Sequence, residues 1–182
     1  MIIKYKPTRI ALTGGPGVGK STILELLKTR GYQTTPEAAR IVIEREQLKD
    51  SDCLPWKNIL KFQNAVSELQ LSLENSITRG IIFSDRGIVD GHAYSKIDKI
   101  ETPKLILENA RNRYSQVFLL DPLPVYEQNT TRWDNIERAK IVHQAIKNAY
   151  LEFEYNPITV PFLQPEQRVD FILNKIIERR RK

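Results

Sequence analysis

A glycine-rich stretch near the amino terminus has the composition and spacing of a phosphate-binding loop. Residues 14–21 read Gly-Gly-Pro-Gly-Val-Gly-Lys-Ser and fit the pattern G-x-x-x-x-G-K-[ST]. Its glycines let consecutive backbone N–H groups converge on phosphate oxygens, because no side chain stands in the way. We expect Lys20 to reach the β- and γ-phosphates and the Ser21 hydroxyl to coordinate Mg²⁺. The residues predicted to bind nucleotide are Gly14, Gly15, Pro16, Gly17, Val18, Gly19, Lys20, Ser21 and Thr22.

The elements on either side of this loop support the same interpretation. The apolar run before it predicts a buried strand over Thr8–Thr13, and the spacing of the apolar residues after it predicts a helix from about Gly19 to Arg30. A phosphate group held by the loop faces the positive end of that helix dipole. A turn with only a structural role needs neither Lys20 nor Ser21.

Acidic residues follow two further predicted strands. Glu37 comes after the short strand 32–35, and Asp85 and Arg86 come after the apolar strand 81–84. Ligands bind at the carboxyl ends of strands in open parallel sheets, so both acids are expected beside the phosphate loop. Asp85 is expected to hold Mg²⁺ directly or through water. The structural alternatives are an acid that stabilises a helix N-terminus for Glu37 and a plain N-cap for Asp85.

The residue after Asp85 bears on the type of chemistry. Hydrolytic ATPases commonly place a glutamate there to activate water, whereas Arg86 can hold phosphate but cannot act as a base. The guanine-reading pattern N-K-x-D is absent, since Asn174-Lys175 is followed by two isoleucines, and so is D-x-x-G. A Ras-like GTPase is therefore disfavoured. An oligomeric AAA+ motor would need a second helical domain, for which the chain has no room.

A long helix is predicted from about Trp56 to Arg79. Apolar residues spaced by three and four form a stripe that we expect to face the core: Ile59, Phe62, Val66, Leu69, Leu73 and Ile77. A polar stripe lies beside it and consists of Gln63, Ser67, Gln70 and Glu74.

The remaining elements continue the alternation of strands and helices. Strands are predicted over 116–120 and 157–161, the latter at a sheet edge because of its prolines, and helices near 88, over 103–114, 134–151 and 165–179. This alternation predicts a three-layer α/β fold with a parallel five-stranded sheet, and the strand order is expected to be 2-3-1-4-5. We expect residues 1–182 to form a single P-loop nucleotide-binding domain.

Composition restricts the class of protein and its partners. Charged residues make up 27% of the chain and hydrophobic residues 41%, and there is no apolar run of about 18 residues that could span a membrane. Cys53 is the single cysteine, which favours a reducing compartment, most simply the cytoplasm. The net charge of +6 is partly carried by residues 179–182, which we interpret as a solvated helix end. No nucleic-acid-binding module is recognisable. A basic protein that binds nucleic acid is therefore kept as a third functional hypothesis, after the kinase and the nucleotide-dependent switch described below.

These motifs together carry a resemblance. The set formed by residues 14–21, Pro36-Glu37, Phe62-Gln63 and Asp85-Arg86 resembles the layout of P-loop deoxynucleoside kinases and of the ribosylnicotinamide kinase domain of bacterial NAD regulators. From LTGGPGVGKST through SDRGIVDGHAY to VPFLQPEQRV, the chain is similar to an AAA-labelled family of small kinase-like P-loop proteins. One departure is Gly87, where many deoxynucleoside kinases have serine.

The resemblance implies roles for individual residues. It implies that Glu37 is the general base on an acceptor hydroxyl and that Asp85 and Arg86 act at Mg²⁺ and phosphate. Gln63 corresponds to the glutamine that binds the acceptor, and a solvated glutamine is its structural alternative. The lid arginines correspond to Arg132 and Arg138.

Further candidates complete the expected site. Arg40 and Asp90 are candidates for contact with the acceptor, although Asp90 could equally lie on a helix surface. The polar segment 127–138 is expected to form a lid, to which both lid arginines can contribute if a helix starts between them, near residue 134.

The sequence thus predicts a kinase that transfers the γ-phosphoryl group of Mg-ATP, with GTP a possible donor, to a hydroxyl of a small, nucleoside-like acceptor. The alternative is a nucleotide-dependent switch or binding protein without kinase activity.

Overall fold

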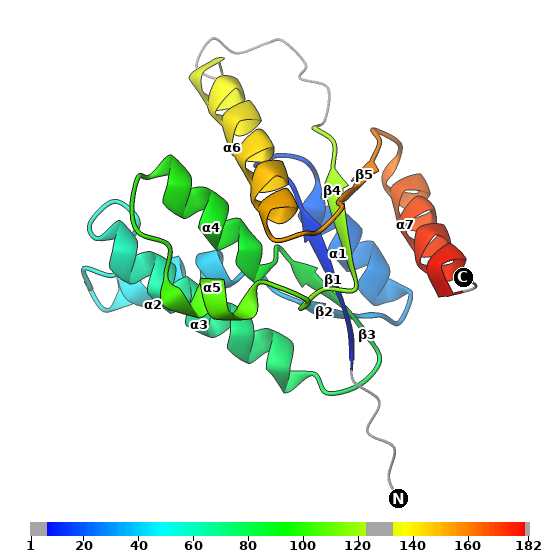
Figure 1. The fold of residues 1–182 in the computed structure, drawn as a ribbon, viewed down its shortest axis with the longest axis horizontal. Coiled ribbons are helices and arrows are strands. Elements are labelled where there is room, and N and C mark those ends of the chain that lie inside the picture. The colour runs from blue at the N-terminus through cyan, green and yellow to red at the C-terminus, as the bar shows by residue number, and fades with distance from the viewer. Residues whose placement is uncertain (1–6, 123–132, 181–182) are drawn as a thin grey trace, which may run out of the picture.

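The structure is a computed structural model and describes residues 7–122 and 133–180 (Figure 1). The five strands are β1 (Thr8–Thr13), β2 (Gln33–Thr35), β3 (Ile81–Asp85), β4 (Gln116–Leu120) and β5 (Ile158–Val160). The helices are α1 (Lys20–Thr29), α2 (Ala38–Leu48), α3 (Ile59–Ser76), α4 (Ile88–Ile97), α5 (Lys104–Asn109), α6 (Trp133–Glu152) and α7 (Pro165–Arg180).

All strands are parallel and pair in the order β2-β3-β1-β4-β5, which confirms the predicted fold. The central strand β1 pairs with β3 on one side and β4 on the other, with Leu12 opposite Asp85 and Phe118. The three strands therefore end together at one edge of the sheet. The short strand β5 lies at the opposite edge from β2, as the prolines around it predicted.

Helices cover both faces of the sheet, which gives the three layers (Figure 1). Side chains alternate along each strand, so Ile10 and Leu12 of β1 pack on one face and Ala11 on the other. The face of Ile10 packs against α1 and α7, through residues such as Leu27 and Ile172. The opposite face packs against α3, α4, α5 and α6. Among the described helices, none combines the length and the apolar character needed to cross a bilayer.

Helix α3 differs from the prediction in its length and in the residues that it buries. It begins at Ile59 because the Asn58 side chain accepts a hydrogen bond from the Lys61 amide, which caps the helix three residues later than expected. It ends at Ser76. Its buried residues are Phe62, Gln63, Ser67, Gln70, Leu71 and Glu74.

The polar stripe of α3 is thus buried, whereas most of the apolar stripe that we expected in the core is only half-buried. The half-buried residues include Val66 and Leu69, which pack beside α2 in a smaller cluster around Val42. The helix therefore presents polar side chains to the interior. Gln63, Ser67 and Gln70 border a cavity there, and Gln70 also donates a hydrogen bond to the turn after β3.

Candidate active site

The predicted phosphate-binding loop, hereafter the P-loop (residues 14–21), joins β1 to α1. Gly14, Gly17 and Gly19 have φ angles of 137°, 74° and 86°, a region that side chains disfavour. Gly14 and Gly15 are also required by space, because a Cβ would lie 2.9 Å from the Leu120 carbonyl oxygen and 2.8 Å from that of Ala139, respectively. The glycines thus let the loop lie between β4 and α6.

Lys20 is buried at the start of α1. Its ammonium group donates hydrogen bonds to the carbonyl oxygens of Gly14, at 3.1 Å, and Gly15, at 3.0 Å. Burial, together with repulsion from Arg86, lowers the pKa of Lys20 to about 8. The folded protein therefore keeps the Lys20 ammonium group charged at a cost in free energy, which a bound anion would offset.

Asp85 ends β3 and is 6% exposed. Its Oδ1 atom is buried without a hydrogen-bond partner among the described residues. Burial and the nearby Glu37 raise the pKa of Asp85 to about 6. The N-cap of α4 is Gly87, so the alternative of Asp85 as a plain N-cap is wrong.

The residues around Asp85 fit a magnesium ion. A buried carboxylate oxygen without a partner is an available ligand, and the exposed Ser21 hydroxyl borders the same cavity. Within the described residues there is no cluster of three or more acidic, histidine or cysteine side chains that could hold a metal. Mg²⁺ at a nucleotide is usually held by one or two protein oxygens, waters and the phosphates themselves, so the Asp85 carboxylate and the Ser21 hydroxyl would suffice as protein ligands.

Arg86 connects the strand ends. Its Nε donates to Glu37 at 2.7 Å, and its Nη1 donates to the carbonyl oxygen of Gly14 at 3.3 Å and to Asp90 at 3.4 Å. The backbone of Arg86 has a φ of 65°, which is unusual for a residue with a side chain. One guanidinium therefore joins the P-loop to the residues after β2 and β3.

Asp90 lies beneath Arg86 and not on a helix surface, so the surface alternative is wrong. Its carboxylate accepts hydrogen bonds from the Thr13 hydroxyl at 2.6 Å and the Tyr150 hydroxyl at 2.8 Å, and also from the Gly87 amide. With these donors and the 3.4 Å contact to Arg86, it fixes the position of the guanidinium.

Gly87 is enclosed by aromatic side chains. This crowding accounts for glycine at a position where many deoxynucleoside kinases have serine. A Cβ at this position would overlap the Tyr150 hydroxyl and lie 2.8 Å from Cζ of Tyr114. The Tyr114 hydroxyl in turn accepts a hydrogen bond from the Ile88 amide at 2.6 Å and donates to Glu74 at 2.8 Å.

Two cavities meet at Glu37 and Arg86. The P-loop cavity, of about 430 Å³, is lined by Pro16, Gly17, Val18, Gly19, Lys20, Ser21, Thr22, Glu37, Asp85 and Arg86. The α3–α4 cavity, of about 290 Å³, has apolar walls that include Ile43, Phe62 and Val66, and polar residues Glu37, Gln63, Ser67, Gln70, Arg86, Asp90, Asp98 and Arg138. A molecule in one cavity would lie next to a molecule in the other.

The structure brings most of the predicted acceptor residues to the α3–α4 cavity. Gln63 is 4% exposed and borders it, so the solvated alternative is wrong, and Arg138 borders it from α6. Arg40 lines neither of these two cavities, and its side chain is 77% exposed and pairs with Glu44. It borders a further, open cavity of about 560 Å³ that Ser21, Glu37 and Asp85 also line.

Part of the predicted lid cannot be compared with the structure. Arg132 and residues 127–132 lie outside the described residues. Helix α6 is described from Trp133, so its first described residue falls between the two lid arginines, close to the start expected near residue 134.

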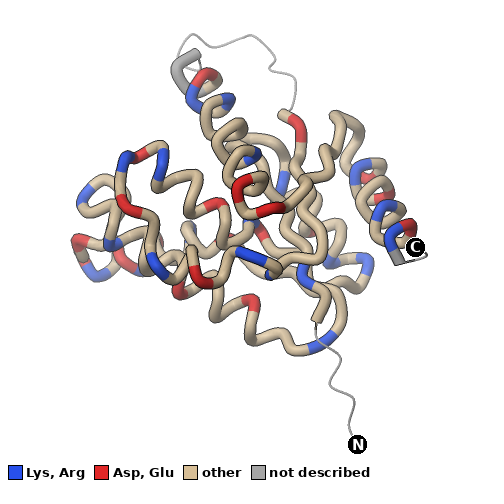
Figure 2. Tube along the Cα trace, in the orientation of Figure 1, with Lys and Arg blue, Asp and Glu red and all other residues tan. Residues whose placement is uncertain are grey.

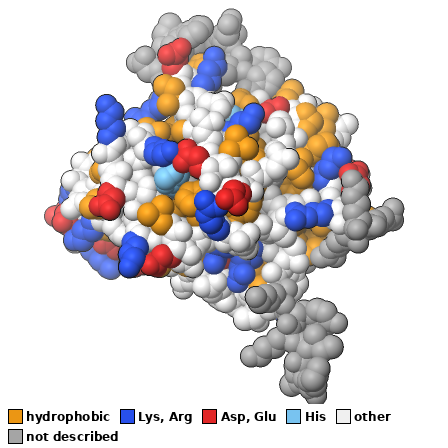
Figure 3. All heavy atoms as spheres, viewed as in Figure 1, with side chains coloured by type: hydrophobic (Ala, Val, Ile, Leu, Met, Phe, Trp, Pro, Cys, Tyr) orange, Lys and Arg blue, Asp and Glu red, His pale blue; other side chains and the backbone are white. Residues whose placement is uncertain are grey.

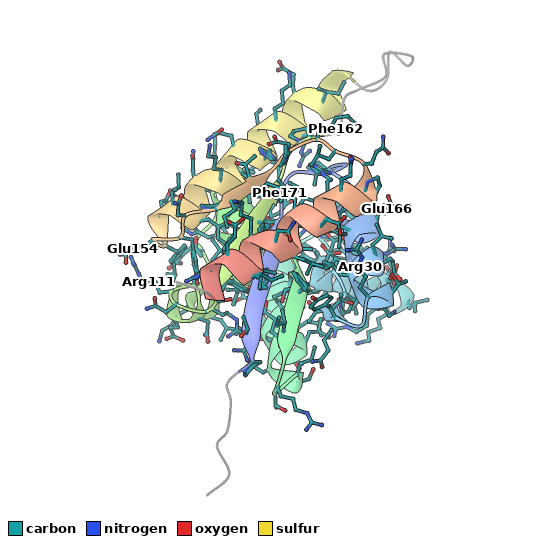
Figure 4. The ribbon with its side chains drawn as sticks, turned by 90° about the vertical axis from the view of Figure 1, so that its right-hand side faces the viewer. Arg30, Arg111, Glu154, Phe162, Glu166 and Phe171 are labelled. Atoms are coloured by element: carbon teal, nitrogen blue, oxygen red, sulfur yellow. The ribbon has the colours of Figure 1, made fainter. Side chains whose placement is uncertain are left out.

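Sequence reasoning missed another cavity and two residues beside the P-loop. The α7 cavity, of about 220 Å³, is lined by Gly19, Thr22, Ile23, Phe162, Leu163, Gln164, Pro165 and Arg168. Figure 4 labels Phe162, which is half exposed, on the loop that leads into α7.

His143 of α6 also lies beside the P-loop, where its Nδ1 accepts a hydrogen bond from the Gly15 amide at 3.4 Å. His143 stands in no motif, whereas Arg168 lies in the stretch VPFLQPEQRV, which shows no role for this side chain. The partners of both residues are backbone groups, most of them far away in the sequence.

The sheet order, the P-loop and the acidic strand ends define a P-loop protein of kinase-like fold. A family model described as an AAA domain matches residues 9–168. The chain therefore belongs to this family. A comparison with curated protein sequences gives no match.

Solved structures of several small-molecule kinases share the fold. Deoxyadenosine kinase from M. mycoides with bound products is 18% identical, with 94% of this chain and 100% of that chain covered and a TM-score of 0.61. Thymidylate kinase from Ehrlichia chaffeensis is 15% identical, with coverage of 94% and 100% and a TM-score of 0.64. NadR protein in complex with NR is 18% identical; 96% of this chain covers 52% of that chain, with a TM-score of 0.65. At these identities the similarity shows the fold alone.

Proposed function

We propose that the protein is a Mg-ATP-dependent kinase that transfers the γ-phosphoryl group to a hydroxyl of a small, nucleoside-like acceptor. The observation that carries the proposal is that Glu37 and Arg86 line both the P-loop cavity and the α3–α4 cavity. A phosphoryl donor and a hydroxyl acceptor must meet at such a junction, because transfer requires the two reacting oxygens to lie on opposite sides of one phosphorus atom.

The donor would occupy the P-loop cavity. The P-loop amides and Lys20 would bind its phosphates, and Ser21 and Asp85 would hold Mg²⁺, which supplies charge neutralisation when bound. The cost of burying Lys20 and Asp85 in charged form supports this assignment, since opposite charge from the ligand relieves it for each of them. The nucleotide base would lie against Thr22 and Phe162 in the α7 cavity.

The acceptor would occupy the α3–α4 cavity. Its volume of about 290 Å³ is at the lower end for ligand pockets, which favours a small acceptor. Apolar walls suit a planar ring, and Gln63 can donate and accept hydrogen bonds to its polar edge. Two of the proteins with a similar fold are named for a nucleoside or complexed with NR, which supports an acceptor of this class.

In the proposed reaction Glu37 accepts the proton of the acceptor hydroxyl. The hydroxyl oxygen then bonds to the γ-phosphorus as the bond from that phosphorus to the β–γ bridging oxygen breaks, and the nucleoside diphosphate leaves. Arg86, held in position by Asp90, borders both cavities and would offset the charge of the transferred group. Arg138, and Arg132 from the proposed lid, would approach from the opposite side and exclude water.

The test is an assay with a pool of candidate acceptors. The protein is incubated with Mg-ATP, or with Mg-GTP, and mass spectrometry detects any acceptor that gains a phosphoryl group. Glu37→Gln is expected to keep nucleotide affinity and to lower turnover by roughly 10²- to 10⁴-fold, the usual contribution of a general base.

Glu44→Gln is the matched control, because Glu44 lies on α2, the helix of which Glu37 is the N-cap, and its side chain is exposed. Nucleotide binding with no transfer to any acceptor would favour the switch alternative. Full activity of Glu37→Gln would exclude Glu37 as the base.

A further inference from the structure

Arg168 of α7 is a buried cation that makes no salt bridge among the described residues, although the charge of nearby Asp121 favours its charged form. It is 2% exposed, and its guanidinium donates only to backbone carbonyl oxygens. Burial lowers the pKa of Arg168 below its ordinary value. An arginine in such surroundings costs stability relative to an apolar residue, so its contacts need an explanation.

The carbonyl groups come from three separate segments. Nη1 donates to Val18 of the P-loop at 2.8 Å, Nη2 donates to Asp121 after β4 at 2.7 Å, and Nε donates to Pro161 after β5 at 3.0 Å. Nη2 also lies 3.4 Å from the Val160 carbonyl oxygen. The three segments all leave the carboxyl edge of the sheet, so one side chain joins the P-loop to the loops that follow β4 and β5.

The contact with Val18 has a consequence for the P-loop. In a planar trans peptide the carbonyl oxygen and the following N–H point in opposite directions. Arg168 holds the Val18 oxygen toward α7, so the Gly19 N–H points away from α7. A positively charged donor also polarises the peptide group and makes that N–H a stronger donor.

The contacts with Pro161 and Asp121 fix a second part of the surroundings. Phe162 follows Pro161 directly and borders the α7 cavity, of which Arg168 is itself a wall. A displacement of this loop would therefore move the wall of the α7 cavity relative to the P-loop.

We propose that Arg168 is a positioning residue for nucleotide binding, which presets the Val18–Gly19 peptide for phosphate and fixes the loop after β5 to the P-loop. The inference rests on the proposed nucleotide binding and concerns a residue that does not touch the reacting atoms. Lysine cannot replace it, because the three segments require donors on both sides of a planar fork.

The test compares Arg168→Lys and Arg168→Gln with the parent by calorimetry, with Mg-ATP and with adenosine as probes. Both variants are expected to bind Mg-ATP at least about tenfold more weakly, the effect of losing one charge-assisted hydrogen bond, and the advantage of ATP over adenosine should shrink. Arg30→Gln is the control, because Arg30, labelled in Figure 4, contacts the same helix through Asp170 at 2.5 Å. The affinity of this variant for Mg-ATP should equal that of the parent.

A parent protein without nucleotide affinity would refute the proposed function itself, whereas parent-like affinity in both Arg168 variants would refute the role of Arg168 alone. A measurement on the parent covers the case in which the variants do not fold. Magnesium tripolyphosphate has no nucleotide base, so it can affect residues 161–168 only through the P-loop and Arg168. Its binding should slow hydrogen exchange in residues 161–168 together with the P-loop. Protection of the P-loop without any change in residues 161–168 would overturn the proposal.

Discussion

Lys20 and Asp85 are both held in the P-loop cavity under conditions that disfavour their charges. The pKa of Lys20 falls to about 8 and that of Asp85 rises to about 6, in both cases chiefly because of burial. Repulsion from Arg86 adds to the shift of the Lys20 pKa and repulsion from Glu37 to that of the Asp85 pKa, whereas the attraction between Lys20 and Asp85 opposes both shifts. Residues that serve a ligand commonly lower the stability of the empty protein, and here the cost can be measured.

We predict that Asp85→Asn stabilises the nucleotide-free protein at pH 7.5 by on the order of 1–3 kcal/mol, because each unit of pKa shift corresponds to about 1.4 kcal/mol. The pKa of Asp85 is raised on folding, so its favourable contribution is present below pH 3.8 and is lost as the pH rises through about 6. The gain should therefore be largest above pH 6 and vanish near pH 4. Thermal unfolding of both proteins across this range measures it.

The control for this prediction is Asp170→Asn, since Asp170 lies exposed on α7 and pairs with Arg30. It should not reproduce the pH-dependent gain. Mg-ATP should stabilise the parent more than Asp85→Asn, and a variant that is less stable than the parent at pH 7.5 would contradict the account of Asp85.

At the residue level the sequence predicted side chains that stand at strand ends or in the glycine-rich pattern. Asp85 and Glu37 could be placed because parallel strands end at one edge of a sheet. Arg168 and His143 could not, since their partners are carbonyl and amide groups of remote segments, and no spacing along the chain encodes such contacts.

Helix α3 acts on the site through its buried polar residues. Gln70 donates to Glu74 at 2.7 Å and, more weakly, to the Arg86 carbonyl oxygen at 3.3 Å. Glu74, fully buried, also accepts hydrogen bonds from Tyr114 and Arg113. The turn after β3, with its positive φ at Arg86, is thus attached to α3 by a chain of hydrogen bonds.

We predict that Tyr114→Phe lowers stability by about 1–3 kcal/mol, because it leaves the Ile88 amide without its partner and removes a donor to buried Glu74. In a kinase assay well below the melting temperature, kcat should fall severalfold while nucleotide affinity changes little, since the turn carries Arg86 and not the P-loop.

Tyr32→Phe is the control for Tyr114→Phe, because Tyr32 packs edge-to-face on Phe83 on the other face of the sheet. A loss of stability without any change in kcat would mean that Tyr114 supports only the fold.

The same helix shows where pattern reading fails at the level of elements. We expected the apolar stripe to face the core, as it does in most amphipathic helices. Here the polar stripe borders a cavity and a buried turn, and the apolar stripe packs on α2. Periodicity locates the helix and its two faces, but it cannot tell which face meets the interior when that interior is polar.

On the face of the molecule drawn in Figure 3, positive charge is not gathered into one patch. Acidic and basic residues alternate along α7, and the face in Figure 3 carries side chains of both signs with hydrophobic groups between them (Figures 2 and 3). Four of the six net positive charges belong to Lys4, Lys6, Arg181 and Lys182, which lie outside the described residues. On the described surface, phosphate ligands would be drawn chiefly to the P-loop.

We predict that removal of residues 179–182 leaves Mg-ATP affinity unchanged, because these residues follow the last buried contact of α7, at Ile176. Binding of random duplex DNA should be weak and should disappear at about 0.2 M salt, since only a nonspecific phosphate term is available. Calorimetry and a DNA titration measure the two quantities. Tight DNA binding at that salt concentration, lost on truncation, would instead support a nucleic-acid binder.

The crowding of Gly87 by Tyr114 and Tyr150 has an evolutionary consequence. Because the tyrosine hydroxyls also hold Ile88 and Asp90, a serine at position 87 cannot be acquired by a single substitution without displacing a group that supports Arg86. A lineage with serine here and one with glycine are therefore separated by an unfit intermediate, unless the tyrosines are exchanged first. In relatives of this chain, the identity of residue 87 should thus be inherited together with the residues at positions 114 and 150.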